Sequence, residues 1–273
     1  SFTLIMGDYY MQIPVKDFYP FVLKYQNHVE RIVQKYHYPK EIGDFLTLIV
    51  PVMVAKYGLS HEREILSLVE SVPIFFSSEE NPENPAFFSR RLQLEGGKVV
   101  IARSIVLYRY SSVGTLSLLD HLLHEWNHAV NSIRNESYQD EEYFYLRTGL
   151  AYFKSRLSNL ELVEKKGVLL EEIINTRQTE EMVDYLLSFS KLDIESATLS
   201  PLLYALRTAT NSQYTSHAYY LQSTVCKTLL HNATFLRTLE QLRFQGEVQD
   251  IEDWFDTITE EKNSYQNLLN YLE

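Results

Sequence analysis

The 273-residue chain contains a single cysteine, Cys226, and no run of basic residues. One thiol can form neither an internal disulfide nor a metal site built from several thiolates, so a disulfide scaffold and a zinc ribbon are both excluded. Any metal must therefore be bound by histidine, aspartate or glutamate. Acidic residues outnumber lysines and arginines by 36 to 25, which gives a formal net charge of −11. Because nucleic-acid binding needs a cationic surface, nucleic acid is not an expected partner.

The chain also lacks a long hydrophobic run. Its most apolar stretch, residues 45–55, is well short of the ~20 residues that cross a bilayer and contains Pro51. We therefore expect a buried core segment and no membrane span. The first residues have no basic region, apolar region or cleavage site of a secretion signal. This favours a cytoplasmic location slightly, although a secreted form whose signal had been removed would look the same.

The chain has enough apolar surface for a large core, since 45% of its residues are hydrophobic and 13% are aromatic. Apolar positions recur at steps of three and four residues, which predicts helices over residues 15–38, 41–56 and 60–71. Pro39 is expected to end the first of these helices and Ser60 to cap the third. The chain is therefore expected to begin with helices.

Strand patterns follow these helices. Residues 87–94 and 99–108 flank Glu95-Gly96-Gly97 and predict the two arms of a β-hairpin. Residues 143–153 are extended in character, and helical patterns dominate from about Gly167 onward. This order of helices, a few strands, a helix, one more strand pair or edge and then helices predicts an α+β fold.

The most informative motif is His124-Glu125-Trp126-Asn127-His128, which lies within a helical pattern at residues 115–133. Side chains four residues apart on an α-helix lie about 40° apart around the axis and ~6 Å apart along it. Both imidazoles can therefore reach a single ion. In this H-E-x-x-H pattern the histidines bind zinc and the glutamate acts as general base on the metal-bound water. The motif predicts metal ligands at His124 and His128 and a catalytic base at Glu125.

An ordinary amphipathic helix can carry the same letters, so a third ligand is needed to support a catalytic zinc site. The segment 170–181, LEEIINTRQTEE, resembles the third-ligand helix of gluzincin (thermolysin-like) metallopeptidases. In that family an Asn-Glu-Gly-Ile-Asn-Glu-type segment followed by Thr-Glu carries the ligand. The resemblance implies that Glu172 is the third zinc ligand. Ile173 replaces a common small residue, and Thr176 stands where the family often has an acidic partner for the first histidine.

Other residues remain alternatives for the third ligand. Glu171 is adjacent in sequence but points about 100° away on a helix, and His217 and His231 lie further along the chain. His121 lies on nearly the same helix face as the motif histidines. Its distance of ~10 Å from His128 along the axis favours a role in supporting the ligands or in packing instead.

The resemblance extends upstream and downstream of the glutamate helix. Leu146-Arg147-Thr148-Gly149-Leu150 is similar to the short Arg-Ser/Thr-Gly-Leu strand that precedes this helix in related bacterial proteins. Residues 99–108 occupy the place where the family has an edge strand that pairs with an extended substrate. The resemblance also implies that His217, Tyr219 or Tyr220 assists the transition state.

These features together predict a zincin-like α+β fold with a small mixed sheet, an edge strand before the zinc helix and a mainly helical C-terminal subdomain. Residues 1–135 would form an N-terminal α+β part that ends with the zinc helix. Residues 136–273 would form the mainly helical part that carries the third ligand, and the two parts would make one catalytic unit.

The predicted function is that of a zinc-dependent metallopeptidase, a hydrolase of peptide bonds, with an endopeptidase preferred over an aminopeptidase. Its cofactor would be zinc and its partner a peptide or protein substrate, with the oligomeric state left open. One alternative is a gluzincin-like zinc-binding protein that has lost or restricted catalysis and serves as a binding or regulatory module. Another is a helical interaction protein in which the motif is accidental.

Overall fold

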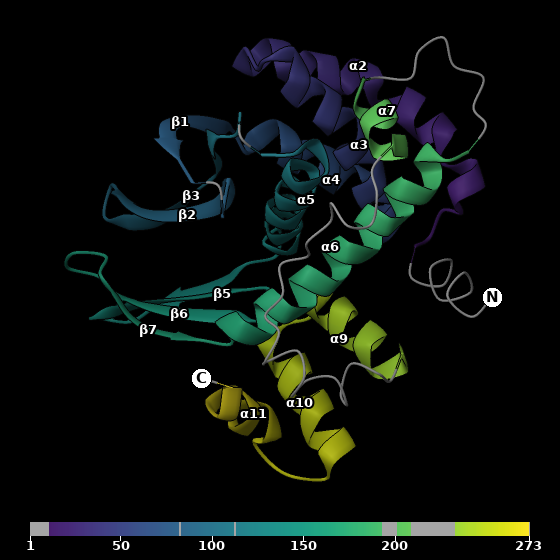
Figure 1. Ribbon diagram of the computed structural model, residues 1–273. Coiled ribbons are helices and arrows are strands. Elements are labelled where there is room, and N and C mark those ends of the chain that lie inside the picture. The colour runs from purple at the N-terminus through teal and green to yellow at the C-terminus, as the bar shows by residue number, and fades with distance from the viewer. Residues whose placement is uncertain (1–10, 82, 112, 193–200, 209–232, 273) are drawn as a thin grey trace. The chain divides into compact units, whose positions relative to one another are not determined.

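Helices and strands follow one another in blocks along the chain (Figure 1). The structure is a computed structural model that describes residues 11–81, 83–111, 113–192, 201–208 and 233–272. Within these ranges it contains both helices and two small sheets, which confirms the α+β class. The zincin-like arrangement and the functional division at residue 135 stay predictions.

The chain forms two compact units, each assembled from separate segments. The first unit comprises Ser1–Ser89, Arg103–Asn127 and Gln178–Ser216, and the second comprises Arg90–Ala102, His128–Arg177 and His217–Glu273.

Three helices supply much of the core of the first unit, namely α2 (Tyr19–Tyr36), α3 (Lys40–Tyr57) and α4 (Glu62–Ser71). Most residues of α3 are buried, which confirms that the apolar stretch at residues 45–55 is a core segment. Within the ranges given above, no single helix has the length and apolar character to cross a membrane. Only α3 taken together with Leu59–Ser71, across a bend of 117°, meets that standard.

The predicted helix ends differ from the observed ones. Ser60 does not cap α4, because residues 59–61 form a separate 3-10 turn and His61 is the N-cap. Another 3-10 turn, Val15–Asp17, precedes α2. The first helix ends at Tyr36, before Pro39, which instead caps the start of α3.

A three-stranded sheet follows α4. It contains β1 (Ile74–Glu80), β2 (Ala86–Glu95) and β3 (Lys98–Arg109) in the order β1-β3-β2. Strands β2 and β3 are joined at the two glycines of the predicted hairpin. The prediction that residues 99–108 form an edge strand is wrong, because β1 pairs in parallel with β3 on its other side. Long-range strand pairing of this kind leaves no local signal, and β2 is an edge strand instead.

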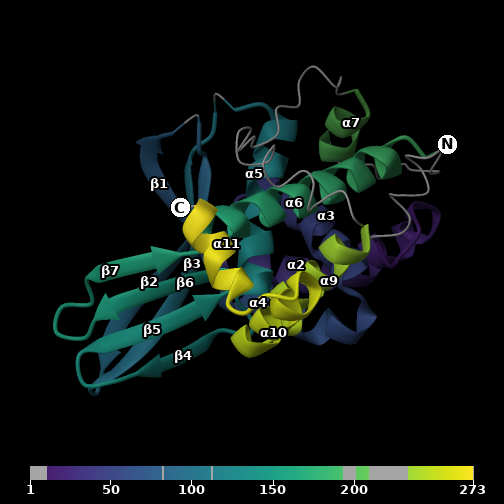
Figure 2. The ribbon, with the colours of Figure 1, turned by 90° about the horizontal axis from the view of Figure 1, so that it is seen from below.

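A four-stranded antiparallel sheet lies wholly in the second unit (Figure 2). Its strands are β4 (Glu136–Gln139), β5 (Tyr143–Thr148), β6 (Ala151–Arg156) and β7 (Leu162–Lys166), in sequence order. The segment 143–153, predicted as a strand pair or an edge, forms the paired strands β5 and β6, and the chain turns between them at Gly149, which has a φ of 58°. The outer strands β4 and β7 were not predicted, because their largely exposed residues show no apolar alternation.

The remaining described residues are mainly helical, as predicted. The helices are α5 (Thr115–Asn131), α6 (Val168–Ser190), α7 (Pro201–Thr208), α9 (Ala233–Gln245), α10 (Val248–Thr259) and α11 (Ser264–Leu272). The rings of Phe255 in α10 and Tyr265 in α11 lie 4.8 Å apart, which joins these two helices through an aromatic contact.

Substitution of Gly167 by alanine should destabilise the second unit. Gly167 has a φ of 70°, and a Cβ there would lie 2.2 Å from the carbonyl oxygen of Leu150. Gly97→Ala is a matched control, since its φ is 79° but no heavy atom lies within 4 Å of the added carbon. Gly97→Ala should cost only the left-handed strain of about 1–2 kcal/mol. Urea denaturation should show a clearly larger loss of unfolding free energy for Gly167→Ala, and equal losses would contradict this account.

Candidate metal centre

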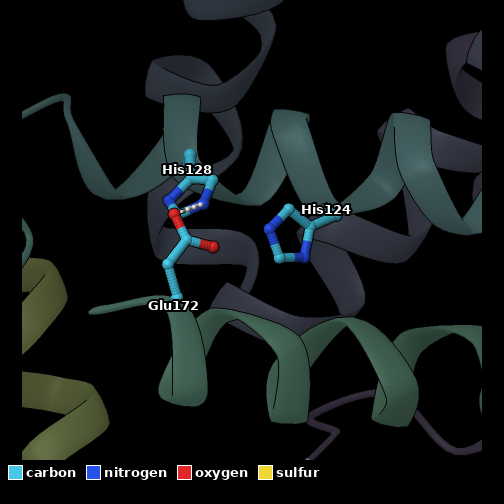
Figure 3. Close-up of side chains that lie close together, drawn as sticks. All are labelled: His124, His128 and Glu172. Atoms are coloured by element: carbon cyan, nitrogen blue, oxygen red, sulfur yellow. Dashed lines mark ion pairs between the residues drawn. The ribbon is translucent and has the colours of Figure 1, made fainter. Parts of the chain in front are cut away.

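Helix α5 presents His124 and His128 on one face. The helix is rich in leucine and has few β-branched residues, a composition that favours an α-helix. Both histidines are largely buried, with 4% and 8% of their surfaces exposed. In Figure 3 the two imidazoles extend from α5 toward Glu172 on α6. The local helix therefore places the two rings one turn apart, as the motif predicts.

The third member of the cluster is Glu172, in the second turn of α6. Its Oε1 lies 3.2 Å from Nε2 of His128. One ligand atom from each of His124, His128 and Glu172 can be chosen so that all three lie within 4.8 Å of one another. Neighbouring ligand atoms of a tetrahedral zinc ion lie roughly 3.3 Å apart, which is within this limit. These three residues can thus bind one metal ion.

Glu171, the neighbour of Glu172, has a different role. Its carboxylate is buried and accepts a hydrogen bond from Nδ1 of His128 at 3.0 Å. It also accepts one from the backbone N–H of Leu150 at 2.8 Å. Because Nδ1 of His128 is held by Glu171, Nε2 is the nitrogen that faces Glu172. Carboxylates placed behind a ligating histidine fix its tautomer and strengthen it as a ligand.

Arg243 of α9 anchors Glu171. Its Nε and Nη2 donate to the two oxygens of Glu171 at 2.8 and 2.5 Å, and Nη2 also donates to Oδ1 of Asn175 at 2.7 Å. The arginine side chain is fully buried. A two-pronged pair of this kind holds the carboxylate plane in one orientation. The orientation of His128 therefore depends on a residue more than a hundred positions further along the chain.

The charges of this group act on one another strongly. Burial alone would raise the pKa of the Glu171 carboxyl, but Arg243 and His128 hold it well below its usual range. Burial lowers the pKa of His128, but the charge of Glu172 and the hydrogen bonds to both glutamates outweigh it and raise the pKa to about 9. Without a metal, His128 therefore keeps a proton at neutral pH.

Gly149 allows the Glu171 carboxylate to approach the backbone of the β5–β6 turn. A Cβ at this position would lie 2.3 Å from Oε2 of Glu171. The segment 148–150 thus holds the Glu171 carboxylate that contacts His128, because Gly149 leaves space for the carboxylate and Leu150 donates its N–H to it. The sequence resemblance included this segment but gave no physical reason for the glycine at position 149.

The predicted base, Glu125, lies beside an edge strand. Its Oε2 accepts a hydrogen bond of 2.6 Å from the backbone N–H of Phe88 in β2. That N–H is therefore directed at the carboxylate and not at another strand. The backbone of β2 and the carboxylate of Glu125 lie together, which is the arrangement needed for a base next to an extended chain.

A buried polar network joins the helices behind the motif. The Tyr57 hydroxyl donates to Oδ1 of Asn127, inside H-E-x-x-H, and to Oε1 of Gln178 at 3.2 Å. Asn127 donates to the same oxygen of Gln178 at 2.9 Å. Lys56 forms a largely buried ion pair of 2.7 Å with Glu181. Buried hydrogen bonds of this kind favour one relative placement of the groups that they join.

Several other sequence predictions have separate outcomes. Thr176, which departs from the family pattern, has a buried hydroxyl without a hydrogen-bond partner among the described residues. His121 is buried and is not a member of the cluster around His128. The residues His217, Tyr219, Tyr220 and His231 lie outside the described ranges, so their proposed roles stay predictions.

Glu171 and Arg243 were missed as functional residues. Glu171 was considered only as a rival ligand, although its position next to Glu172 could have suggested a partner for one of the histidines. Arg243 lies 72 positions after Glu171 and has no local signal.

Comparisons with protein-family models, with curated proteins and with solved structures found no match for this chain.

Neutralising Glu171 should weaken metal binding while the three ligands remain. Loss of a carboxylate behind a ligating histidine typically costs 10–100-fold in affinity, and we expect Glu171→Gln to show a loss of this size in zinc titrations against a competing chelator. The exposed Glu95→Gln is the matched control and should bind like the wild type. Since Glu171→Gln alone removes one ion-pair partner of the buried Arg243, the double variant E171Q/R243M removes both members of that pair and should bind as weakly. Wild-type affinity in both variants would refute the role.

Metal affinity should also depend on pH through His128. Zinc binds the neutral imidazole, so it must displace the proton that His128 retains up to a pH of about 9. The apparent affinity should therefore fall by about tenfold per pH unit as the pH is lowered from about 8.5 to 7. In Glu171→Gln the fall should begin at a lower pH, because one of the groups that raise the pKa is gone. A wild-type affinity that stays constant over this range would contradict the assignment.

Proposed function

We propose that this protein is a zinc-dependent metallopeptidase. The observation that carries the proposal is the cluster of His124, His128 and Glu172, whose ligand atoms lie within 4.8 Å of one another. Two imidazoles and one carboxylate are a donor set that suits zinc and leaves a fourth position open for water or substrate. When bound, zinc would lower the pKa of a coordinated water and polarise the carbonyl of the scissile bond.

The protein's own residues supply the remaining chemistry. Glu125 accepts the proton of the attacking water and delivers it to the leaving amine, which is general acid–base catalysis. Glu171 keeps His128 in the orientation that directs Nε2 toward Glu172. His217, Tyr219 or Tyr220 would donate to the developing oxyanion, as the resemblance to gluzincins implies.

The position of β2 supports a peptide as the substrate class. An edge strand can pair with an extended peptide through its backbone groups. In β2 the backbone N–H of Phe88 lies 2.6 Å from the carboxylate of Glu125, so a peptide that paired along this strand would run next to the proposed base. This favours hydrolysis within a peptide chain, and hence an endopeptidase.

One observation favours the alternative of a zinc-binding module without catalysis. The Glu125 carboxylate already accepts a hydrogen bond from the Phe88 amide, and while it keeps this contact that oxygen is not available to an attacking water. In that case the protein would bind zinc and a peptide but would not cleave it. The two functions differ in a single measurement, the cleavage of peptides by zinc-loaded protein.

Two substitutions should separate metal binding from catalysis. Zinc-loaded wild-type protein is incubated with a broad library of unfolded peptides, and the products are read by mass spectrometry. Glu125→Gln should keep about one zinc per chain and lose cleavage by at least about 10²-fold. Glu172→Ala should lose the metal, because only two protein ligands remain.

Glu95→Gln is again the control and should match the wild type in both readouts. A Glu125→Gln variant that still cleaves at the wild-type rate would refute the role of the base. Wild-type protein that binds zinc but cleaves no peptide would favour the binding module. Wild-type protein that takes up no zinc after gentle purification would overturn both functions.

A further inference from the structure

A pocket of about 410 Å³ lies against one face of the four-stranded sheet of the second unit. Cross-strand pairing shows which side chains share that face. Tyr138 pairs with Tyr145, which pairs with Lys154, and Arg147 pairs with Tyr152. Helices α10 and α11 lie along the same sheet (Figure 2) and contribute Val248, Glu252 and Gln266 to the lining.

Aromatic rings form a platform in this pocket. The rings of Tyr138 and Tyr145 are stacked, with centroids 4.3 Å apart and an angle of 10° between their planes. Tyr138 is 65% exposed, so one face of the stacked pair is open to solvent. An exposed, pre-ordered aromatic face next to a hollow is typical of ligand sites, because the ring offers contact area with little loss of side-chain freedom.

The charged side chains of the pocket are balanced. Arg147 is paired with Glu136, Lys166 with Glu164 at 3.0 Å, and Glu252 accepts a hydrogen bond from Gln266 at 2.8 Å. The lining thus contains three cationic and three acidic residues, the third cation being Lys154, which lies over aromatic rings.

This balance of positive and negative charge indicates which kind of ligand suits the pocket. An anion or a cation would meet both signs of charge and gain little net attraction. The same groups, however, offer N–H donors and carboxylate acceptors side by side. A hydroxyl group can both donate and accept a hydrogen bond, so it can use both kinds of group.

We propose that this pocket binds a neutral, hydroxyl-rich ring compound of the size of a mono- or disaccharide. The apolar face of the sugar ring would lie on Tyr138, and its hydroxyl groups would bond with the charged rim. The volume falls in the range of about 300–1,000 Å³ that small-molecule sites occupy. None of His124, His128, Glu172 or Glu125 lines the pocket, so the inference does not rest on the proposed peptidase activity.

Calorimetric titration of the full chain with glucose, N-acetylglucosamine, maltose and cellobiose tests the proposal. Glucose 6-phosphate and adenine serve as a charged and a non-sugar comparison. At least one neutral saccharide should bind saturably, with an affinity that changes little when salt is raised. Tyr138→Ala should weaken that binding by about tenfold or more, whereas Tyr138→Phe, which keeps the ring, should retain it.

The matched control is Tyr271→Ala. Tyr271 lies on α11 in the same unit, is 74% exposed and is not part of the lining, so its loss should leave the affinity unchanged. The proposal is overturned if no neutral saccharide binds, if only the phosphorylated sugar or adenine binds, or if the two tyrosine-to-alanine variants weaken binding equally. Each variant is checked for a native circular dichroism spectrum before titration.

Discussion

The buried ion pair between Glu171 and Arg243 is the interaction on which the candidate metal centre depends. It fixes the carboxylate that holds Nδ1 of His128, and the same carboxylate is tied to the backbone at Leu150. Two adjacent glutamates thereby take on separate tasks, because one is saturated by protein donors while Glu172 is left facing Nε2 of His128. Burying an arginine and a glutamate is costly unless their hydrogen bonds are met, and here Asn175 and Leu150 help to meet them.

Much of the centre follows from local sequence. The H-E-x-x-H spacing fixes the placement of His124 and His128 on one helix face, and the resemblance of the segment at 170–181 identified Glu172. The two histidines were predictable because a helix converts sequence spacing directly into direction, whereas Glu172 was suggested by the resemblance alone. The hairpin around Gly96 and Gly97 was predictable for the same reason, since turn residues act locally.

What could not be predicted depends on distant parts of the chain. The central position of β3 arises from its pairing with β1, and the role of Glu171 depends on Arg243. Neither contact has a periodic pattern. Strands β4 and β7 were missed because they are the outer strands of their sheet and are mostly exposed, so their residues carry no burial signal. The candidate ligands could therefore be predicted from local sequence, whereas the distant contacts that orient them could not.

The place of Arg243 in the chain has a consequence for how the protein is made. Domains assemble during synthesis as their segments emerge, at about 5–20 residues per second. A nascent chain that has emerged as far as the start of α6 already carries His124, His128 and Glu172, but it lacks the guanidinium that anchors Glu171. Until α9 has emerged and docked, the second histidine has no fixed partner behind it. The candidate metal centre is thus completed only after α9 has emerged, and a shorter nascent chain carries the three candidate ligands without the contact that orients His128.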